Sequence, residues 1–219
     1  MKKLYFYFDV VSPYAYLAST RITEIAEKYG CELQSEPVLL AGILQTHGQK
    51  GPAEIPSKRS HLIKDILRCA AEMDVPLVGP PTHPFNPLLA LRSVLAVTEN
   101  TERNKLAAAL LMAVWGLGKD VADPKVILDV IQGLGMNGAE ILERAQSDNV
   151  KMALRKNTEQ AIAKGVFGVP TFVIDEELFW GNDRLDFLSD YLSGSDPLDK
   201  QKVQNILSRP SSAERTAKR

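Results

Sequence analysis

The chain begins with an apolar, aromatic run that is followed by an amphipathic segment. Residues 3 to 8 consist mainly of Leu, Tyr and Phe, which predicts a buried strand. Apolar side chains then recur on one face of residues 13 to 29, and Gly30 follows where a helix would end. Residues 31 to 38 alternate between apolar and polar positions, as in a second strand. A strand, a helix and a strand of these lengths predict a parallel βαβ unit with a right-handed crossover.

The middle of the chain has helical periodicity, and strand patterns return later. Residues 40 to 150 are helical in pattern and are interrupted by loops rich in Pro and Gly. After a further helix at 150 to 164 we expect strands at 168 to 175 and 177 to 181, joined by a tight acidic turn, and then a helix at 184 to 192. This order predicts the fold class as α/β, thioredoxin-like, with an α-helical insertion.

The same order predicts how the chain is divided. We expect a thioredoxin-like domain made of residues 1–40 and 151–200, and a helical insertion domain made of residues 41–150. Residues 208–219 are small and polar, and they are expected to form a flexible tail.

Composition and charge narrow the range of functions. The 219 residues are 45% hydrophobic and 24% charged, and a net charge of -1 offers no global attraction to nucleic acid or to an anionic membrane. No run approaches the roughly 18 apolar residues that a membrane span needs, and Asp9 interrupts the apolar start that could imitate a signal peptide. Cys31 and Cys69 form neither a C-x-x-C pair nor a metal-binding pattern. We therefore expect a cytoplasmic protein with small-molecule partners and no metal, nucleic-acid or membrane partner.

The pair Ser12-Pro13 lies between the first predicted strand and the first predicted helix. A serine hydroxyl there can accept a hydrogen bond from an N–H of the first helical turn, and proline suits a position where no N–H donor is needed. Ser12 is thus a candidate helix cap. It is also a candidate for chemistry, and the local pattern leaves both roles open.

A second proline, Pro170, directly precedes a predicted strand in GVFGVPTF. Its ring removes a ladder donor, so it should lie at the first position of that strand, after either a cis Val169–Pro170 bond or a trans one at a sheet edge. A helix N-terminus after the first strand, next to such a proline loop, is the geometry that binds glutathione in thioredoxin-like proteins. The backbone of Val169 would then pair with the peptide as an added strand does.

Five stretches, which cover nearly the whole chain in order, carry a family resemblance. They are FDVVSPYAYLA at 8–18, GQKGPAEIPSKRSHLIKDILR at 48–68, HPFNPLLALR at 83–92, AVWGLGKDVADPKVI at 113–127 and GVFGVPTFVIDEELFWGNDRLDFL at 165–188. The sequence resembles 2-hydroxychromene-2-carboxylate isomerases and, more broadly, kappa-class glutathione transferases. Both belong to the DsbA-like branch of the thioredoxin fold.

The resemblance implies that Ser12 stands where oxidoreductases of this fold carry their first active-site cysteine. The tetrad is Ser-Pro-Tyr-Ala, so no thiol is available there and the sulfur must come from glutathione. The Ser12 hydroxyl would donate a hydrogen bond to the glutathione thiolate, and the N-terminus of the following helix would favour the same charge. His47, His61 and His83 are expected at the surface or in loops, because no motif places any of them as a base for Ser12.

The resemblance also implies further contacts for glutathione. Val169 and Pro170 would hold its cysteinyl unit, and Asn182 and Asp183 its γ-glutamyl end, unless the latter two merely cap the helix that follows. Lys58 would pair with the glycyl carboxylate, although an exposed lysine is more often simply solvated. Gln49 stands where the family commonly has Asn, so its longer side chain leaves that contact open.

A second substrate is expected over the sulfur and under the helical insertion. Tyr14, Phe85, Asn86 and Arg92 are candidate contacts for an aromatic carboxylate, with aromatic faces against its ring and Arg or amide groups on its carboxylate. Trp115 is either another wall of that site or a core residue.

The function that the resemblance implies is a homodimeric, glutathione-dependent cis-trans isomerase. It would interconvert 2-hydroxychromene-2-carboxylate and trans-o-hydroxybenzylidenepyruvate in the breakdown of naphthalene-type aromatics, through thiolate addition, bond rotation and thiolate elimination. Two alternatives stay open: a kappa-like transferase or peroxidase that acts on other electrophiles, and a non-catalytic protein of the DsbA fold.

Overall fold

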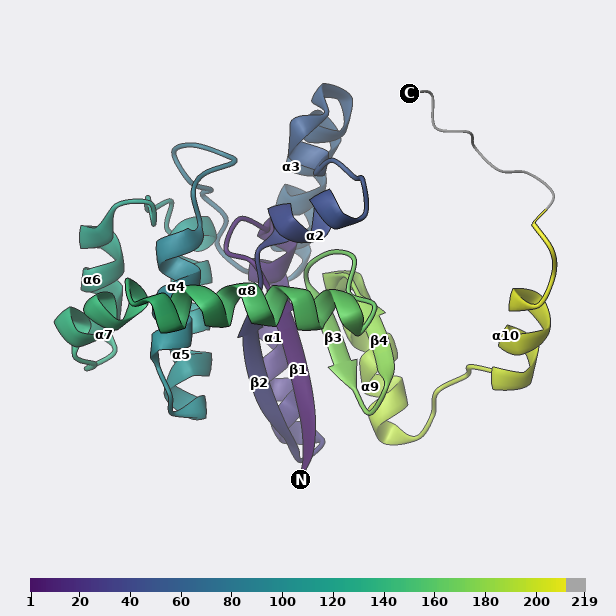
Figure 1. Cartoon of the computed structure of the whole chain (residues 1–219). Coiled ribbons are helices and arrows are strands. Elements are labelled where there is room, and N and C mark those ends of the chain that lie inside the picture. Colours follow the sequence, from purple (N-terminus) through teal and green to yellow (C-terminus); the bar gives the residue numbers. More distant parts are fainter. Residues whose placement is uncertain (212–219) are drawn as a thin grey trace.

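A mixed sheet of four strands lies at the centre of the computed structural model, which describes residues 1–211 (Figure 1). β1 (Lys2–Phe8) pairs in parallel with β2 (Cys31–Pro37) and antiparallel with β3 (Thr171–Ile174), which in turn pairs antiparallel with β4 (Glu177–Trp180). The strand order is β2-β1-β3-β4. α1 (Pro13–Lys28) connects β1 to β2, so the βαβ unit expected from the sequence is confirmed.

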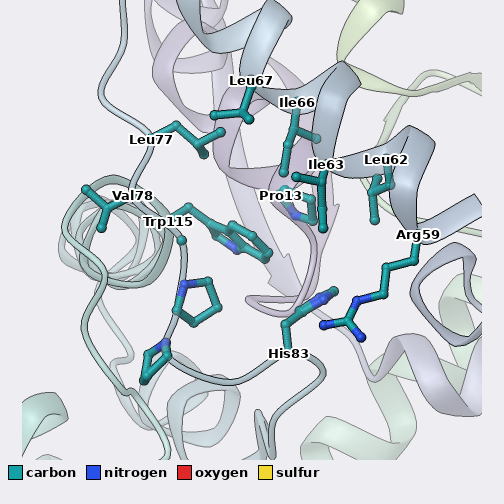
Figure 2. Close-up of a pocket in the computed structure, with 13 residues that line it drawn as sticks. Pro13, Arg59, Leu62, Ile63, Ile66, Leu67, Leu77, Val78, His83 and Trp115 are labelled. Carbon is teal, nitrogen blue, oxygen red and sulfur yellow. The ribbon is translucent and has the colours of Figure 1, made fainter. Parts of the chain in front are cut away.

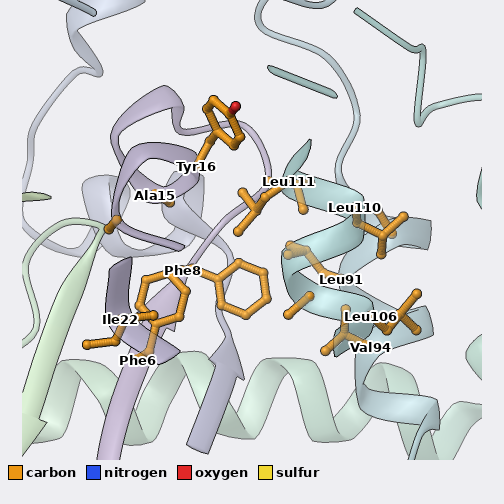
Figure 3. Close-up of a cluster of buried hydrophobic side chains, with 14 of the residues drawn as sticks. Phe6, Phe8, Ala15, Tyr16, Ile22, Leu91, Val94, Leu106, Leu110 and Leu111 are labelled. Atoms are coloured by element: carbon orange, nitrogen blue, oxygen red, sulfur yellow. The ribbon is translucent and has the colours of Figure 1, made fainter. Parts of the chain in front are cut away.

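Alternating side chains of β1 face two different cores. Leu4, Phe6 and Phe8 are buried on the side of α1, where Phe6 stacks on Phe172 of the neighbouring strand with ring centroids 5.5 Å apart. Figure 3 shows the rings of Phe6 and Phe8 between α1 and a group of leucines from the helical block. Tyr7 points to the opposite face and packs in a second, smaller core.

The helical block follows β2 and returns to the sheet at β3. Its elements are α2 (Leu40–Thr46), the short helix η1 (Pro52–Glu54), α3 (Pro56–Glu72), α4 (Leu88–Ala96), α5 (Asn100–Leu111), the π-helical turn η2 (Met112–Gly116), α6 (Pro124–Gly133), α7 (Gly138–Ala145) and α8 (Asp148–Ala163). α5 contacts both α1 and β2, and α8 crosses the sheet in Figure 1. Side chains of this block and of the sheet share one core. The division into a 1–40 plus 151–200 domain and a 41–150 domain stays a prediction.

The chain after β4 differs from the sequence-based expectation. A short helix, η3 (Asn182–Arg184), precedes α9 (Leu185–Ser193), and a further helix, α10 (Lys200–Leu207), follows where no helix was predicted. The pattern did not reveal α10 because its side chains are largely polar and none is buried. From residue 212 onward, the tail predicted at 208–219 lies outside the described residues.

Two boundaries are shifted for local reasons. α8 begins two residues earlier than expected because Ser147 caps it by accepting a hydrogen bond from the Val150 N–H. β3 begins at Thr171, after the proline, because Pro170 has no N–H to offer a sheet ladder. Among residues 1–211, no helix combines the length and the apolar character needed to cross a bilayer.

Candidate functional site

Ser12 is buried at the start of α1, where it caps the helix. Its Oγ accepts a hydrogen bond from the Ala15 N–H at 3.2 Å, and Pro13 occupies the first helical position, so the predicted cap is confirmed. The hydroxyl lies 3.5 Å from the Val169 carbonyl, the outer limit for a hydrogen bond. Its hydrogen therefore has a weak partner inside the protein and can be donated to a ligand.

The Val169–Pro170 loop lies beside this hydroxyl although it is 157 residues away in the sequence. The Val169–Pro170 bond is cis, which is one of the two alternatives expected from the sequence. Within residues 1–211 the Val169 N–H has no hydrogen-bond partner, and its carbonyl has the distant Ser12 hydroxyl. Such backbone groups next to a sheet can pair with an added extended peptide.

Asn182 and Asp183 are joined to the proline loop by one backbone hydrogen bond. The Gly181 N–H donates to the Pro170 carbonyl at 2.9 Å, and the positive φ of Gly181, 109°, turns the chain into η3. η3 contacts α1, so this segment lies beside the helix that Ser12 caps. Among the described residues α9 starts without a side-chain cap, so the alternative that Asn182 or Asp183 merely caps this helix is wrong.

Gln49 lies in the loop between α2 and η1, and Lys58 lies in the first turn of α3. Both side chains are exposed, and the Gln49 N–H donates to the Leu44 carbonyl at 2.8 Å. Within residues 1–211 no hydrogen bond or ion pair joins either side chain to Ser12 or Val169. Their proposed contacts with glutathione thus depend on a ligand that spans from Ser12 to this segment.

A cavity of about 280 Å³ opens beside Pro13, the residue after Ser12 (Figure 2). Apolar side chains of α3 form one wall, and Trp115 with the loop before α4 forms the other. Arg59 and His83 are the basic side chains in the lining, and both point toward its interior in Figure 2. The full lining is Pro13, Arg59, Leu62, Ile63, Ile66, Leu67, Leu77, Val78, Gly79, Pro80, Pro81, His83 and Trp115.

Of the three histidines expected at the surface or in loops, His83 is the one that lies next to Ser12 in the structure. It is half-buried in a loop, whereas His47 and His61 are exposed, and its Nε2 lies 3.0 Å from the Val11 carbonyl oxygen. A carbonyl can only accept, so Nε2 carries the hydrogen. Burial lowers the pKa of His83, and the nearby positive charge of Arg59 lowers it too, against the opposing effect of the Val11 hydrogen bond. His83 is therefore a neutral donor at neutral pH.

The four side chains predicted to contact a second substrate lie outside the cavity lining. The Tyr14 hydroxyl donates to Asp65 at 2.7 Å, and burial together with that carboxylate raises the pKa of Tyr14. Asn86 accepts from the Leu88 N–H at 3.0 Å at the start of α4. Phe85 packs at the edge of the main core, and Arg92 has a buried Nε without a partner among residues 1–211.

Trp115 combines the two roles that the sequence left open. Its side chain is only 4% exposed and belongs to the main core, and it also forms part of the cavity wall. Its Nε1–H donates to the Val10 carbonyl at 2.9 Å. Sequence reasoning missed this contact and those of Arg59 and His83 because each depends on residues far apart in the chain.

Comparison with known proteins identifies the family to which this fold belongs. The model of the DSBA-like thioredoxin domain matches residues 3–193. The chain belongs to the DSBA-like thioredoxin family. Within this family it is 31% identical to the 2-hydroxychromene-2-carboxylate isomerase of Sphingobium xenophagum, over 87% of this chain and 98% of that protein. It is 29% identical to glutathione S-transferase kappa 1 of Rattus norvegicus, over 86% of this chain and 89% of that protein.

A solved structure supports the same placement within the DSBA-like thioredoxin family. The structure of a 2-hydroxychromene-2-carboxylate isomerase superimposes with a TM-score of 0.82 at 26% identity, over 94% of this chain and 99% of that chain. The resemblance predicted from the five sequence stretches and the predicted thioredoxin-like fold with a helical insertion are thereby confirmed.

Proposed function

We propose that this protein is a glutathione-dependent isomerase that interconverts 2-hydroxychromene-2-carboxylate and trans-o-hydroxybenzylidenepyruvate. One observation carries the proposal. The buried Ser12 hydroxyl lies beside the backbone of the Val169–Pro170 loop, at the N-terminus of α1. Relatives named as isomerases and as glutathione transferases support it. The same resemblance suggests a homodimer, a cytoplasmic location and a role in aromatic catabolism, which all stay predictions.

The donor set fits the cysteinyl unit of glutathione. The Val169 N–H, which has no partner among residues 1–211, and the weakly bonded Val169 carbonyl would pair with the backbone of the peptide, which sets its thiol against the Ser12 hydroxyl. Asn182 and Asp183, held by Gly181 next to Pro170, would bind the γ-glutamyl end. Lys58 and Gln49 would bind the glycyl end at the start of α3.

The chemistry that glutathione would supply is a thiol nucleophile, whose reversible addition to the conjugated substrate turns a double bond into a rotating single bond. The Ser12 Oγ–H would donate a hydrogen bond to the thiolate and thereby favour the deprotonated form. The N-terminus of α1 would favour the same negative charge. Lowering a thiol pKa from about 8.5 to about 6.5 requires about 2.7 kcal/mol. One charge-assisted hydrogen bond and a helix terminus supply energy of that order.

The cavity beside Pro13 suits a flat, largely apolar second substrate. Its walls are mainly Leu, Ile and Pro, and the Arg59 guanidinium offers a partner for one carboxylate. Arg59 is better supported in this role than Arg92, because Arg59 belongs to the lining. Tyr14, Phe85 and Asn86 remain proposed contacts for the second substrate, although they do not belong to the lining.

A kappa-like glutathione transferase is the second candidate, because the same thiolate could attack another electrophile and stay attached to it. The rat kappa transferase, at 29% identity, supports this alternative. The two activities differ in their stoichiometry, since isomerisation returns each glutathione molecule and transfer consumes it.

The test is an assay with purified protein, 2-hydroxychromene-2-carboxylate and a small amount of glutathione. Conversion of many substrate molecules for each glutathione, with the free thiol fully recovered, supports the isomerase. Consumption of one thiol for each product supports the transferase instead. Absence of glutathione binding by calorimetry contradicts both and favours a non-catalytic protein of this fold.

A further inference from the structure

The turn between β1 and α1 is held by side chains that come from the helical block. It contains two peptide groups, Val10–Val11 and Val11–Ser12, and both are hydrogen-bonded at both ends. The Val10 carbonyl accepts from Trp115 Nε1 at 2.9 Å, and the Val11 carbonyl accepts from His83 Nε2 at 3.0 Å.

The N–H groups of the same two peptides are bound by Asp9. The Val11 N–H donates to the Asp9 carboxylate at 3.0 Å, and the Ser12 N–H donates to the Asp9 backbone carbonyl at 3.0 Å. The rotation of each peptide plane is therefore fixed at its N–H end from within the turn and at its carbonyl end from the helical block. The second peptide group ends at the Ser12 nitrogen, so its orientation helps to set the direction of the Ser12 side chain.

The two donors also support each other. The rings of His83 and Trp115 meet edge to face, with centroids 5.2 Å apart, and both side chains line the cavity beside Pro13 (Figure 2). Trp115 is nearly fully buried and His83 is half-buried, so water competes weakly for these hydrogen bonds.

We infer that His83 and Trp115 are positioning residues, which fix the two peptide groups before Ser12 and thereby the direction of the Ser12 hydroxyl. The inference rests on the proposed function in one respect: the group being positioned is the donor to the glutathione thiolate. In this inference neither residue is assigned a contact with the thiol. They act through the backbone, from segments 72 and 105 residues away from the carbonyls they bind.

The first test measures the turn in the free protein. His83→Phe and Trp115→Phe each keep an aromatic ring and remove one N–H donor, whereas His83→Gln keeps an N–H donor. Hydrogen exchange of the Val11 and Ser12 amides, followed by NMR, should become about tenfold faster in the two Phe variants, the effect of losing one buried hydrogen bond. Amides of β1 should keep their rates, and His47→Phe, at an exposed histidine, is the control.

The second test measures the bound thiol. Ultraviolet absorbance of the thiolate should show a higher pKa for glutathione bound to His83→Phe than to the wild type. His83→Gln should restore it, and kcat should fall about tenfold in His83→Phe with a nearly unchanged KM for glutathione. If His83→Phe lowered activity only because less of the protein folded, the thiol pKa of glutathione bound to the folded fraction would be unchanged.

The outcomes separate this inference from the proposed function. Unchanged amide exchange in both Phe variants overturns the positioning role. Faster exchange with an unchanged thiol pKa also overturns it, because Ser12 would then act independently of the turn. If wild-type protein binds no glutathione, the proposed function fails, and the amide exchange data alone decide whether the two side chains hold the turn.

Discussion

Asp9 predicts an unusual pH dependence of stability. Its carboxylate is fully buried after β1 and accepts two backbone hydrogen bonds, from Val11 at 3.0 Å and from Leu40 at 2.9 Å. Burial raises the pKa of Asp9 from 3.8 to about 6, and the two hydrogen bonds only partly offset that effect. The folded protein therefore binds a proton at Asp9 more tightly than the unfolded chain does.

The sign and size of the effect follow from linkage. Protonated Asp9 stabilises the folded state. This contribution is fully present below the unfolded pKa of 3.8 and is lost as the pH rises through the folded pKa of about 6. Between pH 7 and pH 5, the wild type should gain about 1.4 kcal/mol in its free energy of unfolding from protonation of Asp9. Most exposed carboxylates act in the opposite sense and at lower pH.

The perturbation is Asp9→Asn, which removes the titrating group at nearly constant shape. Urea unfolding of both proteins at pH 7 and pH 5 gives the difference between their free energies of unfolding, in which the contributions of all other titrating groups cancel. From pH 7 to pH 5, the stability of the wild type relative to Asp9→Asn should rise by about 1.4 kcal/mol. A relative stability that stays constant, or that changes in favour of Asp9→Asn at pH 5, refutes the reasoning.

Three further substitutions, with Arg92→Gln as a comparison for the first, test the site and its supports. Arg59→Gln should raise KM for the aromatic carboxylate about tenfold or more and leave glutathione affinity unchanged, whereas an equal effect of Arg92→Gln would move the carboxylate site to α4. Gly181→Ala should lower stability by about 1 kcal/mol or more in urea unfolding and weaken glutathione binding in calorimetry, because φ there is 109°. Tyr14→Phe should lower the free energy of unfolding by about 1 kcal/mol, because Asp65 loses a 2.7 Å hydrogen bond; an unchanged midpoint would contradict this.

Local patterns predicted the parts of the fold that depend on neighbouring residues. The cap at Ser12 joins residues three apart, and the βαβ unit follows from periodicity within about 35 residues, so the amino-acid sequence alone was enough to predict both. Pro170 was informative for the same reason, since a proline constrains the residues next to it. α10 escaped prediction because its helix buries no apolar face.

The cavity and the turn supports could not be predicted in this way. His83 lies in a loop of prolines without periodicity, and its partner carbonyl belongs to Val11, 72 residues earlier. Arg59 and Trp115 reach the same cavity from α3 and from the π-helical turn, which tertiary packing alone brings together. The family resemblance supplied Ser12 and the glutathione contacts, but the supports behind Ser12 became visible through hydrogen bonds across the fold.

The most direct measurement is the titration of glutathione bound to wild-type protein, Ser12→Ala and Ser12→Thr, followed through thiolate absorbance. We expect a thiol pKa near 6.5 in the wild type, a rise of about one pKa unit or more in Ser12→Ala, and a value close to the wild type in Ser12→Thr, which keeps the hydroxyl. Equal thiol pKa values in wild type and Ser12→Ala would contradict the role assigned to the Ser12 hydroxyl.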